Sequence, residues 1–295
     1  MKTYTSNKIR NVGILAHGGA GKTSLTEAML YNAGHTTRLG KVDDGTTTTD
    51  YLPEEIKRKV TVSTTLAPVE WKDNKINILD TPGYADFIGE VKSAMRAVDG
   101  IVLVVDGVAG VEVQTEVHWD SAEEANMPRL IFINKLDREN SNYYKVLDQL
   151  RERFGSSVVP LTIPIGSEDS FSGVIDILQQ KSYSFEGTKV KENPLTAEQE
   201  AEAAKYKEAL TEAAAEGNDD LLMKYLEGEP LTDEEIKQGL KAGVMHAKVV
   251  PVFAGSASKN IGVQPLLDAI LEMLPSPVDN AKGADLGKEP LAAIV

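Results

Sequence analysis

The stretch "VGILAHGGAGKTSL", residues 12–25, decides the fold of this chain. Its apolar residues 12–16 have the length and composition of a buried strand, and a helix-period pattern follows over 23–33. Between the two lies a glycine-rich turn. Glycine-rich backbone at the start of a helix can point several N–H groups at a phosphate group. The stretch therefore predicts a strand, a phosphate-binding loop and a helix in direct succession.

The loop "AHGGAGKT" at 16–23 supplies the groups that a nucleotide phosphate site needs. We expect Lys22 to reach the β- and γ-phosphates and to serve catalysis, and the Thr23 hydroxyl to bind Mg²⁺. The other contacts to the nucleotide are expected from Ala16, His17, Gly18, Gly19, Ala20 and Gly21. A strict loop of this kind begins with glycine, and the relaxed form permits alanine. We interpret the His17 imidazole as structural rather than as a proton shuttle, and His118 with Trp119 as packing residues.

Strand and helix patterns alternate through most of the chain. Short apolar runs predict strands, and helix-period segments lie between them or follow them. The strands are expected at 12–16, 76–80, 101–106, 130–134 and 249–253, and the helices at 23–33, 86–98, 112–126, 141–154 and 264–274. The stretch 62–71 instead predicts an extended segment that turns at Asp73-Asn74 and pairs antiparallel with 76–80. Because near-continuous apolar strands are typical of parallel sheets, we expect an α/β fold with a doubly wound, mostly parallel sheet.

The alternation breaks between residues 158 and 247. Short β-like pieces at 158–161 and 173–177 precede an Ala/Glu-rich helical tract with two capping-box patterns, Thr196 with Gln199 and Thr232 with Glu235. Residues 191–240 hold 14 acidic and 5 basic side chains, most of the net charge of −14. We interpret 158–247 as an inserted α+β subdomain. Its charge is typical of a solvated helical face, and a docking surface for a basic partner is the alternative.

The stretch "NKLD" at 134–137 predicts which base is recognised. The Asp137 carboxylate can accept hydrogen bonds from guanine N1–H and N2–H₂, a donor pair that adenine lacks. Lys135 can lie along the purine face, and Asn134 can brace the loop and meet the base edge. After the last strand, a backbone N–H of Ser256-Ala257 can meet guanine O6. Together with the phosphate loop, these residues favour GTP and GDP over the nucleotides of an ATP-using kinase.

A second phosphate-facing turn is predicted by "INILDTPGYADF", residues 76–87. Asp80 ends the strand and can hold Mg²⁺ through water, and the Gly83 N–H can meet the γ-phosphate. The polar region 45–62 fits a mobile segment that senses that phosphate. Thr61 is its expected Mg²⁺-binding residue, with Asp50 as a further candidate ligand. An ordinary strand threonine is the alternative interpretation of Thr61.

Composition narrows the possible settings. The 295 residues include no cysteine, which excludes disulfides and thiolate metal sites and favours the cytoplasm. No apolar run approaches the roughly 18 residues that span a bilayer, so no membrane partner is expected. The net charge of −14 opposes wrapping around DNA, because phosphate binding depends on lysine and arginine. Since most of the acidic excess lies in 191–240, the rest of the chain can still present a basic face.

The motifs, in order, resemble the nucleotide-binding domain of bacterial elongation factor G and its close paralogues. They are "AHxxAGKT" from Ala16, Asp44-Gly45 with Asp50, "RxVTV" from Arg58, "DTPG" from Asp80, "NKLDR" from Asn134, "FxGVID" from Phe171 and "GSAxKNxGVQPLLD" from Gly255. The resemblance implies a P-loop GTPase and translation factor that uses GTP, GDP and Mg²⁺. It also implies a monomer that acts on the ribosome, through rRNA and stalk proteins.

The resemblance further implies the domain organisation. A GTP-binding domain is expected over 1–157 and 248–278, and the family's inserted subdomain over 158–247. Residues 279–295 are expected to form a linker and the start of a following β-barrel domain, because "EPLAAIV" at 289–295 predicts a strand that simply stops.

Three positions depart from the elongation factor G pattern. Gly19 replaces an aspartate, Lys59 replaces the glycine of Arg-Gly-Ile-Thr, and Tyr84 replaces the histidine that orients the attacking water. A phenol is a poor base at neutral pH, although its hydroxyl can hold a water or simply pack. The sequence therefore predicts GTP hydrolysis with weak intrinsic activity that depends on a partner. The alternative is a GTP-controlled ribosome-binding paralogue, for rescue or protection, with little or no translocation activity.

Overall fold

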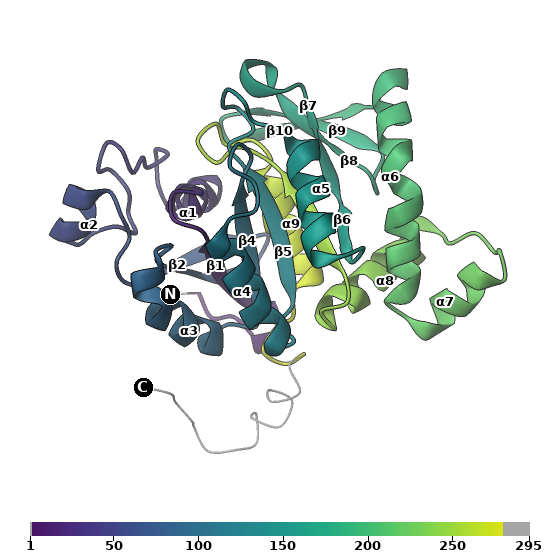
Figure 1. Cartoon of the computed structure of the whole chain (residues 1–295), viewed down its shortest axis with the longest axis horizontal. Coiled ribbons are helices and arrows are strands. Elements are labelled where there is room, and N and C mark those ends of the chain that lie inside the picture. Colours follow the sequence, from purple (N-terminus) through teal and green to yellow (C-terminus); the bar gives the residue numbers. More distant parts are fainter. Residues whose placement is uncertain (1, 280–295) are drawn as a thin grey trace.

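A seven-stranded sheet forms the centre of the molecule, shown here as a computed structural model that describes residues 2–279 (Figure 1). The strand order is β2-β3-β1-β4-β5-β11-β6, with β2 and β3 antiparallel and the other neighbours parallel. The strands are β1 (Ile9–Ala16), β2 (Thr65–Trp71), β3 (Asn74–Asp80), β4 (Gly100–Asp106), β5 (Arg129–Asn134), β6 (Val158–Pro160) and β11 (Val250–Ala254). The predicted mostly parallel α/β sheet is thus confirmed. The strand predicted at 289–295 lies outside the described residues.

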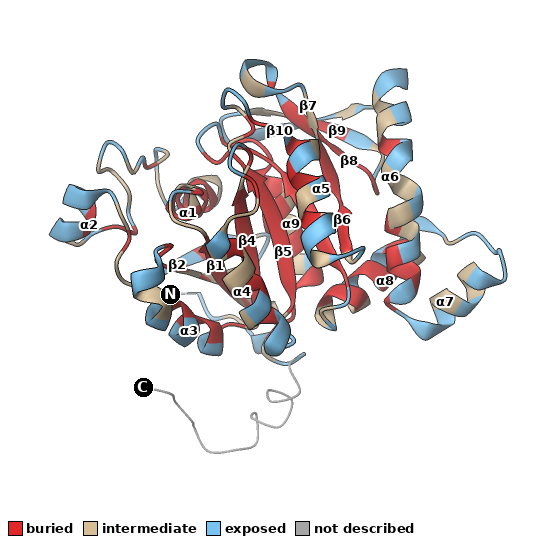
Figure 2. Ribbon diagram, viewed as in Figure 1, coloured by how far each residue is buried: buried red, intermediate tan, exposed pale blue. Residues whose placement is uncertain are grey.

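Helices cover both faces of this sheet, and α4 and α5 lie across the face opposite α9 (Figure 1). The helices are α1 (Lys22–Asn32), α2 (Pro53–Arg58), α3 (Ile88–Ala97), α4 (Val113–Glu124), α5 (Tyr143–Phe154) and α9 (Val263–Met273), with 3₁₀ turns η1 (Ser6–Lys8), η2 (Ala85–Phe87) and η3 (Glu168–Ser170). The central strands are consequently buried along their length (Figure 2). Phe132 on β5 pairs with Phe253 on β11 at the centre of the core. Burying each phenylalanine side chain stabilises the fold by about 2–3 kcal/mol.

The β2–β3 hairpin forms one edge of the sheet, as predicted. Lys72 and Asp73 both have positive φ, 45° and 60°, which matches the turn type that suits the twist of a two-residue hairpin loop. The Trp71 indole N–H donates to Asp268 Oδ1 on α9 at 2.8 Å, and the Lys72 ammonium contacts the same oxygen. The hairpin is therefore fixed to the helix on its flank.

The inserted region carries its own four-stranded antiparallel sheet, in the order β10-β9-β8-β7. Its elements are β7 (Thr162–Ile165), β8 (Gly173–Asp176), β9 (Lys181–Glu186), β10 (Lys189–Pro194), α6 (Ala197–Glu216), α7 (Asp219–Leu226) and α8 (Asp233–Met245). Both predicted capping boxes are present: Thr196 Oγ1 accepts from the Gln199 amide, and Thr232 Oγ1 from the Glu235 amide. The helices stand at the opposite side of the molecule from α2 (Figure 1).

One strand of the predicted insertion belongs to the main sheet. β6 pairs in parallel with β11, through Val158 opposite Val250, and forms the last strand of the seven. The reason is that α5 returns the chain to the sheet edge before the insertion begins. A three-residue strand carries too little pattern to reveal from sequence which of two sheets it joins.

Candidate nucleotide site

The phosphate loop lies between β1 and α1, and its glycines adopt conformations that other residues avoid. Gly19 and Gly21 have φ of 82° and 99°, in the left-handed region. A side chain at Gly21 would also collide with the Asn134 amide. Gly21 is the N-cap of α1, so the helix begins at Lys22, with Thr23 in its first turn. The loop and its helix are where the sequence predicted them.

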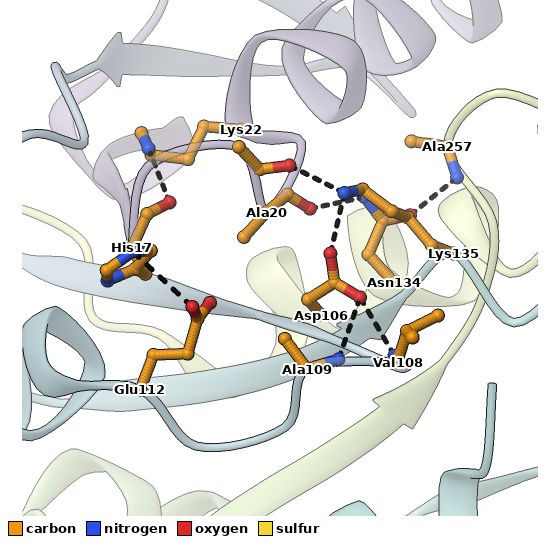
Figure 3. Close-up of polar contacts among 11 residues, drawn as sticks. His17, Ala20, Lys22, Asp106, Val108, Ala109, Glu112, Asn134, Lys135 and Ala257 are labelled. Carbon is orange, nitrogen blue, oxygen red and sulfur yellow. Dashed lines mark hydrogen bonds and ion pairs between the residues drawn. The ribbon is translucent and has the colours of Figure 1, made fainter. Parts of the chain in front are cut away.

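Lys22 is buried beneath the loop. Its ammonium donates to the carbonyl oxygen of Ala16 at 3.3 Å and to that of His17 at 3.3 Å, the second of which is drawn in Figure 3. Burial lowers the pKa of Lys22 to about 8, and the Asp80 and Asp50 carboxylates oppose that shift. A side chain at Gly83 would overlap the ammonium and come within 3.0 Å of the Gly18 backbone. The Lys22 ammonium, Gly18 and Gly83 thus lie close together at one end of the loop. A terminal phosphate can approach the ammonium and the Gly83 backbone there.

The four predicted cation ligands lie in one group. Thr23 Oγ1 is 2.9 Å from Thr61 Oγ1, which donates to Asp50 Oδ1 at 2.8 Å. Neither oxygen of the buried Asp80 has a hydrogen-bond partner among residues 2–279, although the Lys22 charge and the Thr23 hydroxyl are near enough to oppose the shift of its pKa. Burial is the larger effect and raises the pKa of Asp80 to about 7.

These groups fit Mg²⁺. Two hydroxyls and carboxylate oxygens are hard ligands of the kind that Mg²⁺ takes, and the two unpartnered Asp80 oxygens need a counter-charge. Across the described part of the chain, no three His, Cys, Asp or Glu side chains gather at metal-binding spacing. A protein-only cage is therefore not what these residues form. The set suits an ion that keeps water and phosphate oxygens as most of its ligands.

Two buried glutamates hold the segment that carries Thr61, and neither was predicted from the sequence. Glu27 on α1 accepts from the amides of Thr48 and Thr49 at 2.6 and 3.2 Å. Glu55 on α2 accepts from the amides of Val62 and Ser63 at 2.9 and 3.2 Å. These carboxylates fix the backbone on both sides of Asp50 and Thr61. The available sequence signal was Glu27, a charged residue among the apolar residues of α1.

At the other end of the loop, Asn134 joins three segments. Its Nδ2 donates to the Ala20 carbonyl at 2.9 Å, and its Oδ1 accepts from the Ala257 amide at 2.9 Å (Figure 3). The phosphate loop, the end of β5 and the loop after β11 are therefore tied together. The Ser256 amide donates to the Ile261 carbonyl at 3.0 Å. Because both predicted loop amides already have protein acceptors, a contact to guanine O6 would share one of these donors.

Lys135 and Asp106 form a second tie. Lys135 has a φ of 64°, and its ammonium donates to the Gly19 carbonyl and to Asp106 Oδ2 at 2.6 Å each (Figure 3). Burial would raise the pKa of Asp106, but hydrogen bonds from Lys135 and from the amides of Val108 and Ala109 outweigh it and lower that pKa. Asp106 is a site residue that sequence reasoning missed. Its signal was its place at the end of β4, beside Asn134 in register.

Asp137 keeps an acceptor free for a ligand. Its Oδ2 accepts weakly from the Ser258 hydroxyl at 3.4 Å, while its buried Oδ1 lacks any partner in the described chain. Buried acceptors in native proteins are nearly always paired, so an unpaired one points to a missing donor. Guanine supplies such a donor.

Tyr84 and His17 lie at the start of the phosphate loop. A side chain at Gly18 would lie 3.1 Å from the Tyr84 ring, so this half-exposed phenol packs over the loop. His17 Nε2 lies 3.4 Å from Glu112 Oε1, an arrangement that links the loop to the residue before α4 (Figure 3). His118 and Trp119 are both buried, as predicted.

A glycine-rich loop ahead of α1, tied by Asn134 to the end of β5 at the same edge of a mostly parallel sheet, is typical of P-loop GTP-binding proteins. Residues 7–276 match the model of the elongation factor Tu GTP binding domain. The chain belongs to that family, the GTP-binding domains of translation-factor GTPases.

One solved structure shows how far the likeness extends. A crystal structure of a protein from Thermus thermophilus superimposes with a TM-score of 0.87 at 38% sequence identity. The match covers 92% of this chain and 41% of that one, so this chain spans less than half of its relative's length. Within residues 2–279, none of the helices is both long and apolar enough to cross a bilayer.

Proposed function

We propose that this chain is the GTPase domain of a translation factor of the elongation factor G class, which acts on the ribosome through a GTP/GDP switch. The observation that carries the proposal is the two-ended site. A lysine ammonium and a cation-ligand set lie at one end of the loop, and a free Asp137 oxygen lies at the other. That pairing suits a guanine nucleotide that carries a terminal phosphate.

Each group at the phosphate end has a proposed role. Lys22 stabilises charge on the transferring phosphoryl group, and the Gly83 N–H positions that group. Thr23, Thr61, Asp80 and Asp50 are the proposed holders of Mg²⁺, which when bound neutralises charge on the phosphate oxygens. When the terminal phosphate is lost, the interactions that hold Thr61 beside Thr23 are weakened. The segment held by Glu27 and Glu55 is the proposed switch.

Tyr84 is the proposed water-positioning residue. Its packing over Gly18 supports a place beside the terminal phosphate. A phenol hydroxyl can donate to or accept from a water but is a weak base, so intrinsic hydrolysis should be slow and stimulated by ribosomes.

Single-turnover hydrolysis of GTP, with and without ribosomes, tests this role. Tyr84→Phe keeps the ring and removes the hydroxyl, and it should slow the ribosome-stimulated step about tenfold. Tyr84→His should raise the stimulated rate above wild type. If Tyr84→Phe matches wild type in both conditions, the hydroxyl has no part in hydrolysis. If wild type does not hydrolyse GTP even with ribosomes, the proposed activity fails.

The departures at Gly19, Lys59 and Tyr84 favour a second candidate: a paralogue that occupies the ribosome for rescue or protection. Depletion of elongation factor G, followed by expression of the full-length protein, separates the two. Restored growth supports translocation. Failure to restore growth while GTP and ribosome binding persist supports the paralogue.

We further propose a cytoplasmic monomer with a GTP-binding unit that includes β6, over 1–160 and 248–278, and an insertion over 161–247. The family's partners, rRNA and the ribosomal stalk, are the proposed contacts. The strongly acidic insertion supports a basic partner surface for that region.

A further inference from the structure

Asn260, in the loop that follows β11 and near the predicted guanine site, makes a hydrogen bond to the insertion. Asn260 is 3% exposed, and its Nδ2 donates to the carbonyl of Gly187 at 2.7 Å. Gly187 lies in the turn between β9 and β10, so the partner belongs to the insertion rather than to the nucleotide-binding sheet. The insertion therefore contacts the nucleotide site's own supporting loop.

The same side chain also reaches α1, the helix that follows the phosphate loop. Asn260 Oδ1 accepts from Asn32 Nδ2 at 2.6 Å, and Asn260 Nδ2 donates to Asn32 Oδ1 at 3.1 Å. Asn32 ends α1, the helix whose first residues are Lys22 and Thr23. One amide thus connects the insertion, the loop after β11 and the helix of the phosphate loop.

A second hydrogen bond reinforces this link. The Gln264 side chain, on α9, donates to the Thr188 carbonyl in the same turn at 2.7 Å. Gln264 is 5% exposed, so solvent does not compete for this bond. The turn is held to the nucleotide-binding domain at two successive carbonyls.

The loop itself needs support. Asn260 has a φ of 56°, a left-handed conformation that asparagine tolerates better than most residues. Ser256 and Ile261 close the loop through two backbone hydrogen bonds of 3.0 and 2.9 Å. Between them lie Ala257, whose amide meets Asn134, and Ser258, whose hydroxyl meets Asp137. Movement of Asn260 would therefore shift groups that frame the guanine pocket.

We propose that Asn260 is a positioning residue for guanine recognition, and that the β9–β10 turn of the insertion holds it in place. The proposal rests on the proposed function, since it assumes that guanine occupies the Asp137 pocket. A force on the insertion is then transmitted through Asn260 to the groups that hold the guanine base, although the insertion does not contact the nucleotide. A partner that pulls on the insertion speeds GDP release.

Dissociation of fluorescent mant-GDP from the purified chain tests the proposal. Asn260→Gly removes the side chain without forcing a Cβ into the left-handed region, and Gln264→Ala breaks the second link without touching the loop. Asn260→Gly loses three side-chain hydrogen bonds and Gln264→Ala loses one, so the dissociation rate should rise about 5- to 30-fold for Asn260→Gly and less for Gln264→Ala. The association rate should stay within about twofold of wild type.

Asn11→Ala is the matched control. Asn11 accepts from Asn77 Nδ2 and donates to Asp99 Oδ2, at 2.8 Å each, at the opposite end of β1. Asn11→Ala should lower the melting temperature by about as much as Asn260→Gly does, and it should leave the rate of GDP release unchanged. IDP, which keeps O6 and lacks the 2-amino group, distinguishes positioning from direct contact. Asn260→Gly should speed GDP and IDP release by the same factor.

Asn32→Ala separates α1 from the insertion. It removes both hydrogen bonds between Asn32 and Asn260 and keeps the Asn260 donor to Gly187. Faster release from Gln264→Ala supports the insertion as the holder. Wild-type release from Gln264→Ala, with fast release from Asn260→Gly and from Asn32→Ala, assigns the loop to Asn32 and overturns the insertion's part. Wild-type release from Asn260→Gly overturns the whole proposal. If wild type itself shows no preference for GDP over ADP, it is the proposed function that fails.

Discussion

The two ends of the nucleotide site are built in opposite ways. At the base end, Asn134 and Lys135 have their hydrogen-bonding groups paired with protein, and Asp106 fixes Lys135 in turn. At the phosphate end, the two Asp80 oxygens are buried and unpartnered within the described residues, next to the buried ammonium of Lys22. Apart from the Asp137 Oδ1, the groups at the base end are thus paired within the protein, whereas the phosphate end holds a buried carboxylate with both oxygens unpartnered among the described residues.

This difference has an energetic meaning. Paired groups in the base pocket cost little to bury, so the pocket can be rigid before the nucleotide arrives. An unpaired buried carboxylate costs several kcal/mol unless a cation or donor meets it. The phosphate end therefore lowers the stability of the free protein, and bound nucleotide with its metal should recover it. We therefore expect base specificity to come from one end and the binding-linked change in conformation from the other.

The largest expected effect breaks the base end. Asp137→Asn removes a carboxylate that can take two charge-assisted hydrogen bonds from guanine, each worth about 1.5–3 kcal/mol. We expect calorimetry to show GDP affinity reduced by about 100-fold or more, with ADP affinity unchanged. Asp148→Asn, on the exposed side of α5, is the control and should keep the wild-type preference. If Asp137→Asn keeps the wild-type preference for GDP over ADP, Asp137 does not bind guanine.

The next effect acts on the phosphate end. Asp80→Asn keeps the shape of the side chain but removes the charge that attracts a divalent cation. In wild type, EDTA should speed GDP release about tenfold because metal support is lost, whereas Asp80→Asn should release GDP fast with or without EDTA. Asp86→Asn, an exposed acid in η2, should respond like wild type. An EDTA response in Asp80→Asn equal to that of wild type would argue against a cation at this position.

Local patterns allowed much of this site to be predicted from sequence. The β1–loop–α1 succession, the β2–β3 hairpin and the two capping boxes each depend on residues close in the chain, and all are confirmed, although the hairpin turns at Lys72-Asp73, one residue before the predicted Asp73-Asn74. Long-range partners could not be predicted in this way. Asp106 meets Lys135 across two strands, and Asn260 meets Gly187 across 73 positions. Such contacts depend on how the sheet is ordered, which periodicity alone does not determine.

His118 provides a pH-dependent test of the buried layer beneath the phosphate loop. Burial, together with the nearby Lys22 charge, lowers the pKa of His118 to about 4 from its ordinary value near 6.5. The unfolded chain therefore binds a proton that the native state excludes, so stability is full above pH 6.5 and falls as the pH drops toward 4. At pH 5 the loss should be about 2 kcal/mol.

His118→Leu should remove that loss. In urea denaturation, its free energy of unfolding should fall about 2 kcal/mol less than that of wild type between pH 7 and pH 5. Neither imidazole nitrogen makes a hydrogen bond of normal geometry among the residues described, although the Ala16 backbone is near enough to oppose the shift of the His118 pKa, so the variant should cost little at pH 7. His246→Leu, an exposed histidine at the end of α8, is the control and should follow the wild-type profile. If the pH dependence of the free energy of unfolding is the same in His118→Leu as in wild type, a group other than His118 accounts for the loss of stability.

The smallest expected effect concerns Lys59, which lies in the segment that brings Thr61 to the phosphate end. Lys59 ends α2 with a φ of 57°, a left-handed conformation that costs a non-glycine residue about 1–2 kcal/mol. Lys59→Gly relieves this strain and loses part of the gain to the greater freedom of the unfolded chain, so thermal melting should rise by about 1–3 °C. Lys57→Gly, two residues earlier within the helix, should lower it by a similar amount, because glycine there only weakens the helix. If Lys59→Gly raises the melting temperature and Lys57→Gly lowers it, the backbone at Lys59 is strained. If both variants lower the melting temperature, this segment is unstrained. The contrast with the base end then lies in the buried charges alone.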